Sequence, residues 1–320
     1  MADNDSVLTA AAAWKGAPMA IATVVSTWGS APRPRGSHMI VHADGRFEGS
    51  VSGGCVESDI LATAADVIAG APFVVKNYGV EDAAAWEVGL PCGGEIAVMV
   101  QPVSAEGFDP ELFDRISEAR DRGKALSVTT DLDTGASSLR PAQGAMFVNR
   151  YDPPRRLLIV GAVQIAQALA GLARELGIAT VVIDPRARFL TEERFPGVVL
   201  DDGWPDEAVA AYAPGPSTAV VTLSHDTKID DPALIAALAS DAAYVGALGS
   251  RRSHAARRER LAAAGVSEER IDQIDAPVGL DIGAIGPAEI ALSIAAAMIA
   301  AFNARDGLKK PAASLLVAGA

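Results

Sequence analysis

The sequence predicts an α/β protein of two domains, an N-terminal α+β domain followed by a C-terminal Rossmann-like domain with a parallel sheet. Residues 157–184 read as strand, glycine turn, helix, strand and acid, and strand and helix patterns keep alternating after them, which is typical of a parallel sheet with crossover helices. Residues 1–150 instead hold short β-branched runs joined by hairpin signals. A chain of 320 residues, 50% of them hydrophobic, is long enough for two cores.

Composition and charge exclude several classes of function. The 27 basic and 40 acidic residues give a net charge of −13, which argues against general binding to nucleic acid or to an anionic membrane. The sequence has no apolar run of about 18 residues that would predict a membrane span, and the acidic start does not resemble a secretory signal. With only two cysteines, we expect a cytoplasmic protein without a structural disulfide.

The first elements are a short amphipathic helix expected at 6–15 and a buried strand at 19–27. A proline-rich loop with two arginines, Arg33 and Arg35, follows the strand. Side chains two positions apart on an extended loop point in different directions. Either arginine could therefore bind an anion through two donors, or both could be solvated surface residues.

The stretch Gly53-Gly54-Cys55 places a thiol directly after a glycine pair, between a hairpin expected at 38–52 and a helix expected at 60–70. Glycines allow positive φ and close approach of a ligand, and the start of a helix supplies unpaired N–H donors and a partial positive charge. A thiol at such a place favours its thiolate form. The alternative is a tight turn in which Cys55 is a small buried apolar residue.

A second thiol, Cys92, stands before another glycine pair, Gly93-Gly94, and a strand is expected at 96–100. Both of the chain's two cysteines thus stand beside a glycine pair, which is unlikely to be an accident. We therefore expect the two glycine pairs to approach the same ligand or each other. The other elements expected in this half are a strand at 73–78, a helix at 110–122 and a strand at 124–130.

We expect the domain boundary between residues 150 and 151. Periodicity is lost through 131–149, and residues 151–155 have the composition of a linker. The predicted domains are therefore 1–150 and 151–306, followed by a loosely packed tail at 307–320.

The second domain opens on a strand, a glycine turn, a helix and a second strand between Leu157 and Ile183, with Gly161 at the turn and Asp184 after the second strand. This arrangement is typical of the dinucleotide-binding βαβ unit. The fingerprint is incomplete, because Val163 stands where a second glycine would let a pyrophosphate approach the backbone. Binding of NAD(P) is therefore doubtful, and the alternative is that Gly161 only makes the turn and Asp184 only ends the strand.

Further strands and helices follow, and the carboxyl ends of the strands are where open parallel sheets bind ligands. On that edge we expect His225, Asp226 and Arg251. Arg251 could neutralise a phosphate or could simply begin a solvated helix. His225 could act as a general base, although adjacent residues rarely orient one another. The expected elements are strands at 218–223 and 243–248, helices at 230–239 and 253–264, and a long helix through Ile290, Ile294, Met298 and Ala301.

Taken in order, several stretches resemble the XdhC/CoxI family, the xanthine dehydrogenase accessory factors. The resemblance covers most of the chain, and the sequence departs from the family pattern at Val163 and Gln164, where the family usually has glycine and histidine. The stretches are GSAPRPRG (29–36), DGRFEGSVSGGCVES (44–58), LPCGGE (90–95), LLIVGA (157–162), YVGALGSRR (244–252) and GLDIGAIGPAEIALSI (279–294).

The resemblance implies a chaperone that binds the molybdenum cofactor, assists its sulfuration and inserts it into a molybdenum hydroxylase of the xanthine dehydrogenase type. The implied partners are that client enzyme, a cysteine desulfurase and a second copy of the chain in a homodimer. Cys55 and Cys92 are the implied ligands of the molybdenum that the cofactor carries. The residues expected to bind the cofactor are Arg33, Gly53, Gly54, Cys55, Cys92, Gly93, Gly94, Gly161, Asp184 and Arg251.

Two other functions stay open at this point. The βαβ unit would also suit an NAD(P)-dependent oxidoreductase or another nucleotide-binding protein. The two cysteines beside glycine pairs would also suit a redox pair that senses an oxidant.

Overall fold

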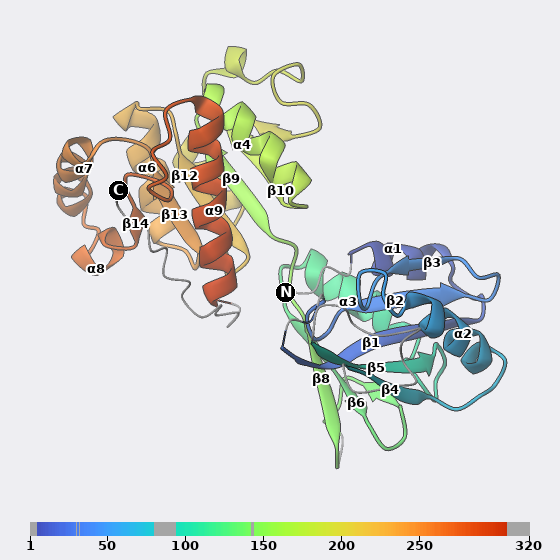
Figure 1. Ribbon diagram of the computed structural model, residues 1–320. Helices are drawn as coiled ribbons and strands as arrows, with labels where there is room; N and C mark the ends of the chain where they lie inside the picture. Colours follow the sequence, from blue (N-terminus) through green and yellow to red (C-terminus); the bar gives the residue numbers. More distant parts are fainter. Residues whose placement is uncertain (1–4, 30, 32, 80–93, 142–143, 306–320) are drawn as a thin grey trace, which may run out of the picture. The chain divides into compact units, whose positions relative to one another are not determined.

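The computed structural model describes residues 5–29, 31, 33–79, 94–141 and 144–305 (Figure 1). The chain forms two compact units, Met1–Pro153 and Pro154–Ala320. The division between them falls a few residues after the boundary expected from the sequence. Each unit has its own sheets and its own hydrophobic clusters.

A five-stranded antiparallel sheet forms the centre of the N-terminal unit, in the order β3-β2-β1-β5-β4. Six consecutive residues of β1, Met19 to Val24, are buried, as expected of an apolar, β-branched run in a central strand. The predicted hairpin forms between β2 and β3, with Gly45 at φ +91° in the turn. The strands are β1 (Met19–Trp28), β2 (His38–His42), β3 (Phe47–Gly49), β4 (Val74–Tyr78) and β5 (Glu95–Pro102).

Helices cover both faces of this sheet, because alternate side chains of a strand point to opposite sides. Ala20 and Ala22 of β1 belong to the cluster that includes α2 (Glu57–Ile68). Met19 and Ile21 belong to a separate cluster with α1 (Asp5–Ala13) and α3 (Glu111–Asp121). The face under α2 is therefore distinct from the face under α1 and α3.

A second sheet of this unit has the order β7-β6-β8, and the sequence predicted only β6 (Leu126–Asp131). β7 (Ser137–Ser138) and β8 (Met146–Tyr151) lie where no periodicity was found, because β7 has two residues and β8 exposes apolar Met146 and Val148. Tyr151, expected in the linker, instead ends β8, and its buried hydroxyl lies 2.6 Å from Nε2 of His38.

The C-terminal unit contains the predicted Rossmann-like parallel sheet, in the order β11-β10-β9-β12-β13-β14. The strand order reverses direction between β9 and β12, which makes their carboxyl ends the topological switch point. β11 and β14 were missed because strands of two or three residues carry no period. The strands are β9 (Arg156–Val160), β10 (Ala179–Ile183), β11 (Val199–Asp201), β12 (Thr218–Thr222), β13 (Tyr244–Ala247) and β14 (Ile274–Asp275).

Helices pack on both faces of the parallel sheet, as crossover connections require. One face carries α4 (Gln164–Glu175) and α9 (Pro287–Arg305), which lie side by side in Figure 1. The other carries α5 (Pro205–Ala211), α6 (Thr227–Leu238), α7 (Arg251–Ala263) and α8 (Glu268–Ile271). Strand β9 is covered on both sides, and its residues Leu157 to Val160 are fully buried.

Candidate functional site

Several of the segments singled out in the sequence meet at one end of the five-stranded sheet. Trp28, the last residue of β1, pairs with Glu95, the first residue of β5, and Tyr78 at the end of β4 pairs with Ile96. The hydroxyl of Tyr78 donates a hydrogen bond of 2.6 Å to Asp59 in the first turn of α2. This end of the sheet therefore brings together the start of the proline-arginine loop, the entry to β5 and the start of α2.

The Gly53-Gly54 turn precedes α2 in conformations that favour glycine, with φ of +79° and +124°. In this turn the chain folds around the carboxylate of Glu57, the first residue of α2. Oε1 of Glu57 accepts hydrogen bonds from the backbone N–H groups of Val51, Ser52 and Gly53, and Oε2 accepts them from Gly54 and Val56. Five backbone donors thus converge on one side chain, an arrangement that ordinarily binds an anion.

Two serine hydroxyl groups also donate hydrogen bonds to the carboxylate of Glu57. Ser50 donates to Oε1 at 2.6 Å, and Ser52 donates to Oε2. Burial acts to raise the pKa of Glu57, but the hydrogen bonds from these hydroxyls and from the backbone outweigh it and lower that pKa to about 2. The carboxylate of Glu57 is therefore charged throughout the physiological range.

The prediction that the glycine turn offers unpaired N–H groups to a ligand is thus wrong for these residues, because Glu57 already occupies their anion-binding centre. Gly53 and Gly54 are exposed, and nothing lies within 4 Å of where a side chain would start at either one. Cys55 is half-buried and packs, with Ala31, against the cluster under α2. The loop therefore holds Cys55 in a fixed place beside an open stretch of backbone.

The two arginines of loop 29–36 have different surroundings, as their spacing predicted. Arg35 donates to the carbonyl oxygen of Val25 at 3.0 Å, and its guanidinium lies 4.6 Å from the centre of the Phe147 ring. Arg33 is half-buried, and among the described residues no hydrogen bond or ion pair engages it. All of the guanidinium donors of Arg33 are therefore available to an anion, whereas Arg35 uses its Nε within the fold.

The second glycine pair is only partly described. Gly94 is buried immediately before β5, at the same end of the sheet. Cys92 and Gly93 lie outside the described residues, so the predicted meeting of the two thiols stays a prediction. In the described part of the chain, no three His, Cys, Asp or Glu side chains are grouped to hold a metal ion.

In the C-terminal unit, Gly161 lies at the switch point, where β9 and β12 end side by side. Its φ is +104°, and an added Cβ would lie 2.7 Å from the backbone nitrogen of Ser224. Glycine is therefore required here by the close approach of two chain segments, which gives it a structural reason independent of any ligand.

Asp184 is fully buried and its carboxylate is used within the fold. It accepts hydrogen bonds from the N–H of Ala162 at 2.8 Å and from Nε and Nη2 of Arg186 at 2.9 and 2.8 Å. Burial alone would raise the pKa of Asp184, but these bonds hold it below its ordinary value. The carboxylate fixes the β9–α4 turn, so a ribose hydroxyl would have to displace Arg186 or Ala162 to bind it.

We expect Asp184→Asn to lower the free energy of unfolding of the C-terminal unit by roughly 3 kcal/mol, because an amide turns one donor toward the donors of Ala162 or Arg186. Urea unfolding followed by hydrogen exchange of peptides from 156–201 measures this change. Asp226→Asn is the matched control, since Asp226 is exposed and caps α6, where asparagine serves about as well as aspartate. Equal effects of the two changes would contradict this role of Asp184.

The other residues predicted at this edge do not form a catalytic group. Asp226 accepts a hydrogen bond from the N–H of Lys228 as the cap of α6, rather than orienting His225, which is exposed. Arg251 is exposed at the start of α7. The general-base interpretation of His225 is therefore not supported by the geometry.

Two buried charged residues at the same edge were missed, because no local pattern in the sequence marks them. Arg257 is 5% exposed, and it donates from Nη2 to the carbonyl oxygen of Leu248, while Nε and Nη1 have no hydrogen-bond partner among the described residues. Asp230 is 2% exposed, accepts two hydrogen bonds from Ser224, and has a pKa raised by burial. Each of the two side chains thus holds a loop of this edge by hydrogen bonds, Arg257 the one after β13 and Asp230 the one after β12.

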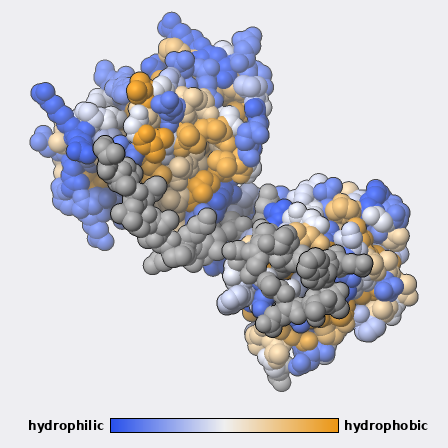
Figure 2. Space-filling view, in the orientation of Figure 1, coloured by the Kyte–Doolittle hydropathy of each residue, from blue (hydrophilic) through white to orange (hydrophobic). Residues whose placement is uncertain are grey.

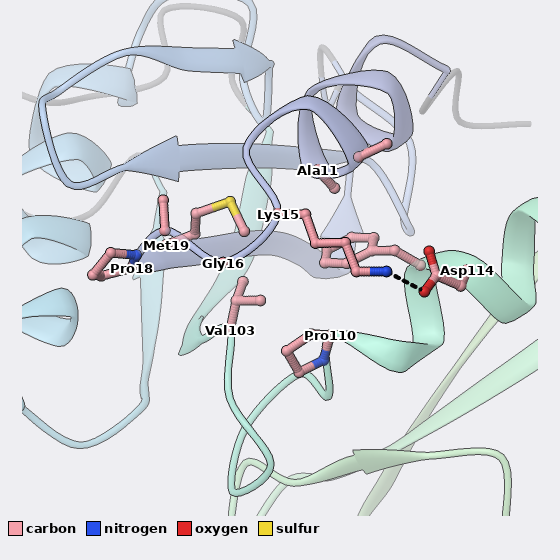
Figure 3. Close-up of a pocket in the computed structure, with 11 residues that line it drawn as sticks. Ala11, Lys15, Gly16, Pro18, Met19, Val103, Pro110 and Asp114 are labelled. Atoms are coloured by element: carbon pink, nitrogen blue, oxygen red, sulfur yellow. Dashed lines mark hydrogen bonds and ion pairs between the residues drawn. The ribbon is translucent and has the colours of Figure 1, made fainter.

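A surface pocket of about 490 Å³ lies in the N-terminal unit, between α1, the start of β1 and α3 (Figure 3). Its lining is mostly apolar, and an ion pair of 2.8 Å between Lys15 and Asp114 lies at its side. None of the predicted site residues lines this pocket. It belongs to the face of the sheet under α1 and α3, whereas Cys55 belongs to the face under α2.

Comparison with protein families gives two matches. Residues 157–298 match a model described as the XdhC Rossmann domain, and residues 12–79 match a model described as the XdhC and CoxI family. The second match contains the whole loop around Glu57.

Similar proteins span nearly the whole chain. The molybdenum cofactor insertion chaperone PaoD of Escherichia coli is 31% identical over 282 residues, which cover 86% of this chain and 81% of that protein. A Bacillus subtilis protein named as a probable xanthine dehydrogenase component is 27% identical over 314 residues, 87% of this chain and 92% of that protein. A crystal structure described as a xanthine dehydrogenase from Bacillus halodurans matches with a TM-score of 0.78 and 27% identity, over 97% of this chain and 98% of that one.

Proposed function

The chain belongs to the XdhC and CoxI family, and on this basis we propose that it binds the molybdenum cofactor and helps to insert it into a molybdenum hydroxylase of the xanthine dehydrogenase type. The observation that best supports the proposal is the loop at residues 50–57, in which Glu57 holds the backbone on both sides of Cys55. The similarity to PaoD, named as an insertion chaperone, supports the same function.

The chemistry of the molybdenum cofactor suits this loop. The cofactor is an anionic, phosphorylated pterin with a thiophilic metal, and thiolates are suitable ligands for such a metal. Cys55 would contact the molybdenum, with Cys92 as a second thiol. Arg33 would pair with the phosphate, since guanidinium groups bind phosphate through two donors. The open backbone at Gly53 and Gly54 would let the flat pterin approach closely.

The proposal extends to how the cofactor is matured. We propose that Cys55 shields the molybdenum while its sulfido ligand is introduced, with a cysteine desulfurase as the source of sulfur. The protein would act in the cytoplasm as a homodimer and pass the sulfurated cofactor to the client enzyme. Gly93 and Gly94 would contribute to the same binding place.

Activation of a client enzyme tests the proposed function. A xanthine dehydrogenase-type client produced together with this chain is expected to gain activity, because it receives sulfurated cofactor. Cys55→Ala should remove most of that gain, whereas Ser58→Ala, an exposed neighbour in α2, should keep it. Equal client activity with the wild-type chain, with Cys55→Ala and with no chain would contradict the proposal.

A function as an NAD(P)-dependent oxidoreductase has less support from the geometry. The acid expected to bind the ribose, Asp184, is saturated by Ala162 and Arg186, and Gly161 is explained by its approach to Ser224. Val163 keeps a side chain at the turn where a pyrophosphate would lie. We therefore propose that Gly161 and Asp184 serve the architecture of the second unit, and that exposed Arg251 is available to contact the cofactor.

A further inference from the structure

Helix α7 (Arg251–Ala263) concentrates positive charge in a chain whose net charge is −13. Residues 251–260 include five arginines and one acid, Glu259. Figure 2 shows hydrophilic surface on the flank of the C-terminal unit where Figure 1 places α7. Arg251, Arg252 and Arg257 form no ion pair with a described residue, whereas the other two arginines do. Those pairs are Arg258 with Glu268 and Asp272, and Arg260 with Asp231.

The first turn of α7 carries charges that the helix itself disfavours. The N-terminal end of a helix has a partial positive charge, so acidic side chains are preferred there. Arg251 and Arg252 are instead exposed at this end, and the first turn has no acid. Ser250 caps the helix by accepting a hydrogen bond of 3.1 Å from the N–H of Ser253. The N–H groups of Arg251 and Arg252 have no hydrogen-bond partner in the described part of the chain, so they are available to an anion.

α7 differs in this respect from the other helices that begin at the same edge of the sheet. α6 begins at Asp226, whose carboxylate accepts from the N–H of Lys228, and α5 has Asp206 and Glu207 in its first turn. The carboxylate of Asp184 holds the turn before α4. A carboxylate thus already lies at each of those helix starts and would repel a bound anion.

A buried arginine behind the turn gives independent evidence for an anionic ligand. Arg257 is 5% exposed, yet Nε and Nη1 of its guanidinium have no hydrogen-bond partner among the residues that the structure describes. Its Nη2 donates to the carbonyl oxygen of Leu248 at 2.8 Å, so the guanidinium points at the backbone that enters the turn. The charge of buried Asp230 acts on Arg257, but the two form no ion pair. A buried charge that is incompletely balanced is costly, and an anion bound at the turn would reduce that cost.

Gly249 leaves space in front of this guanidinium. Its φ is +141°, and an added Cβ would lie 2.6 Å from Oγ of Ser253 and 3.7 Å from Nη2 of Arg257. His254 lies three positions before Arg257, hence on the same side of the helix, and its buried Nδ1 also lacks a partner among the described residues. A side chain at position 249 would therefore fill the place where polar groups of α7 face the turn.

We propose that the turn at residues 249–253 binds the phosphate group of a small ligand. The N–H and guanidinium groups of Arg251 and Arg252 contact the phosphate oxygens, and Arg257 balances their charge from behind the turn. A phosphate monoester carries a charge of about −1.5 to −2 at pH 7, which suits three arginines better than a carboxylate does. Nucleotides and the molybdenum cofactor both carry such a group. Only an assignment to the cofactor rests on the proposed function.

Calorimetric titration of the full chain with inorganic pyrophosphate tests the site, since this probe has phosphate groups but neither a nucleoside nor a pterin. The wild-type chain is expected to bind it, and Arg251→Ala combined with Arg252→Ala should weaken binding about 10-fold or more. Arg122→Ala combined with Lys124→Ala is the matched control, because it removes two positive charges from exposed positions of the N-terminal unit. No binding at millimolar pyrophosphate, or equal affinities of all three chains, would overturn the proposal.

Hydrogen exchange with and without pyrophosphate tests where the probe binds. Exchange should slow in peptides that cover residues 249–256, because the N–H groups of Arg251 and Arg252 become hydrogen-bonded. Slower exchange at residues 161–167 without a change at 249–256 would overturn the proposal, since it would place the phosphate at the first βα turn, as in dinucleotide-binding units.

The source of the phosphate is tested by comparing chains purified from hosts with and without molybdopterin synthesis. Weaker pyrophosphate binding by the chain that carries cofactor would support the site and assign its phosphate to the cofactor. Equal binding by both chains, together with tighter binding of ATP than of pyrophosphate, would support the site and assign it to a nucleotide. A chain that binds no phosphate leaves the cofactor proposal standing, because client activation and Cys55→Ala test that proposal separately.

Discussion

Glu57→Gln is expected to lower the free energy of unfolding of the N-terminal unit by about 3 kcal/mol. The carboxylate accepts hydrogen bonds from five backbone N–H groups and two serine hydroxyls. Glutamine keeps one acceptor oxygen and turns an NH₂ group toward the donors on the other side. The magnitude follows from the pKa, since lowering it from 4.5 to about 2 corresponds to about 3 kcal/mol at 1.36 kcal/mol per unit.

The same residue gives a pH dependence with a defined sign. The folded-state pKa of Glu57 lies below its unfolded value, so this stabilisation is fully present above pH 4.5 and is lost as the pH falls toward 2. Stability of the N-terminal unit should therefore decrease between about pH 5 and pH 2 in the wild type, and less so in Glu57→Gln.

Hydrogen exchange of peptides covering residues 49–68, measured in urea at several pH values, reports on this unit separately from the C-terminal one. Glu48→Gln is the control, because Glu48 is exposed on β3. Equal loss of stability on acidification in the wild type and in Glu57→Gln would show that Glu57 does not organise the loop.

Gly161→Ala is expected to destabilise the C-terminal unit by roughly 3–5 kcal/mol. The added Cβ would lie 2.7 Å from the Ser224 nitrogen and 2.9 Å from its Cα, and the φ of +104° is unfavourable for alanine. Strain of this kind costs about 1–3 kcal/mol and overpacking costs a similar amount. The melting temperature of this unit should fall by roughly 10 °C or more.

Gly171→Ala is the matched control for this change. Gly171 lies inside α4, and nothing is within 4 Å of its would-be Cβ. Alanine there should raise the stability by up to about 1 kcal/mol, because it favours the helix. If calorimetry showed the two variants melting together, the close approach of β9 and β12 at Gly161 would be contradicted.

The sequence predicted the elements that repeat a pattern and missed those that are too short to have one. The apolar run from Leu157 to Val160 and the helix after Gly161 were found because their burial follows from period and composition. β7 and β14, with two residues each, exist only through pairing with longer strands. Tyr151 was assigned to the linker because its packing against His38 is a contact between residues far apart in sequence.

The sequence predicted where the glycine turn and its thiol lie in the fold, but not how the turn is arranged internally. A thiol after Gly53-Gly54 at the start of a helix could be read from the sequence. The role of Glu57 could not, because nothing local shows that a side chain at the first helical position turns back to accept the N–H groups before it. The hydrogen bond from Arg186 to the carboxylate of Asp184 likewise could not be predicted from the sequence, because it depends on the folded structure.

The most direct test of the central claim is the cofactor content of the purified full-length chain, produced in a host that makes molybdopterin. Fluorescence of the oxidised pterin and molybdenum by mass spectrometry measure that content. We expect the wild-type chain to carry both pterin and molybdenum, and Cys55→Ala, with an unchanged melting temperature, to lose most of the molybdenum. A wild-type chain without pterin, or a Cys55→Ala chain with the full content of both, would contradict the account.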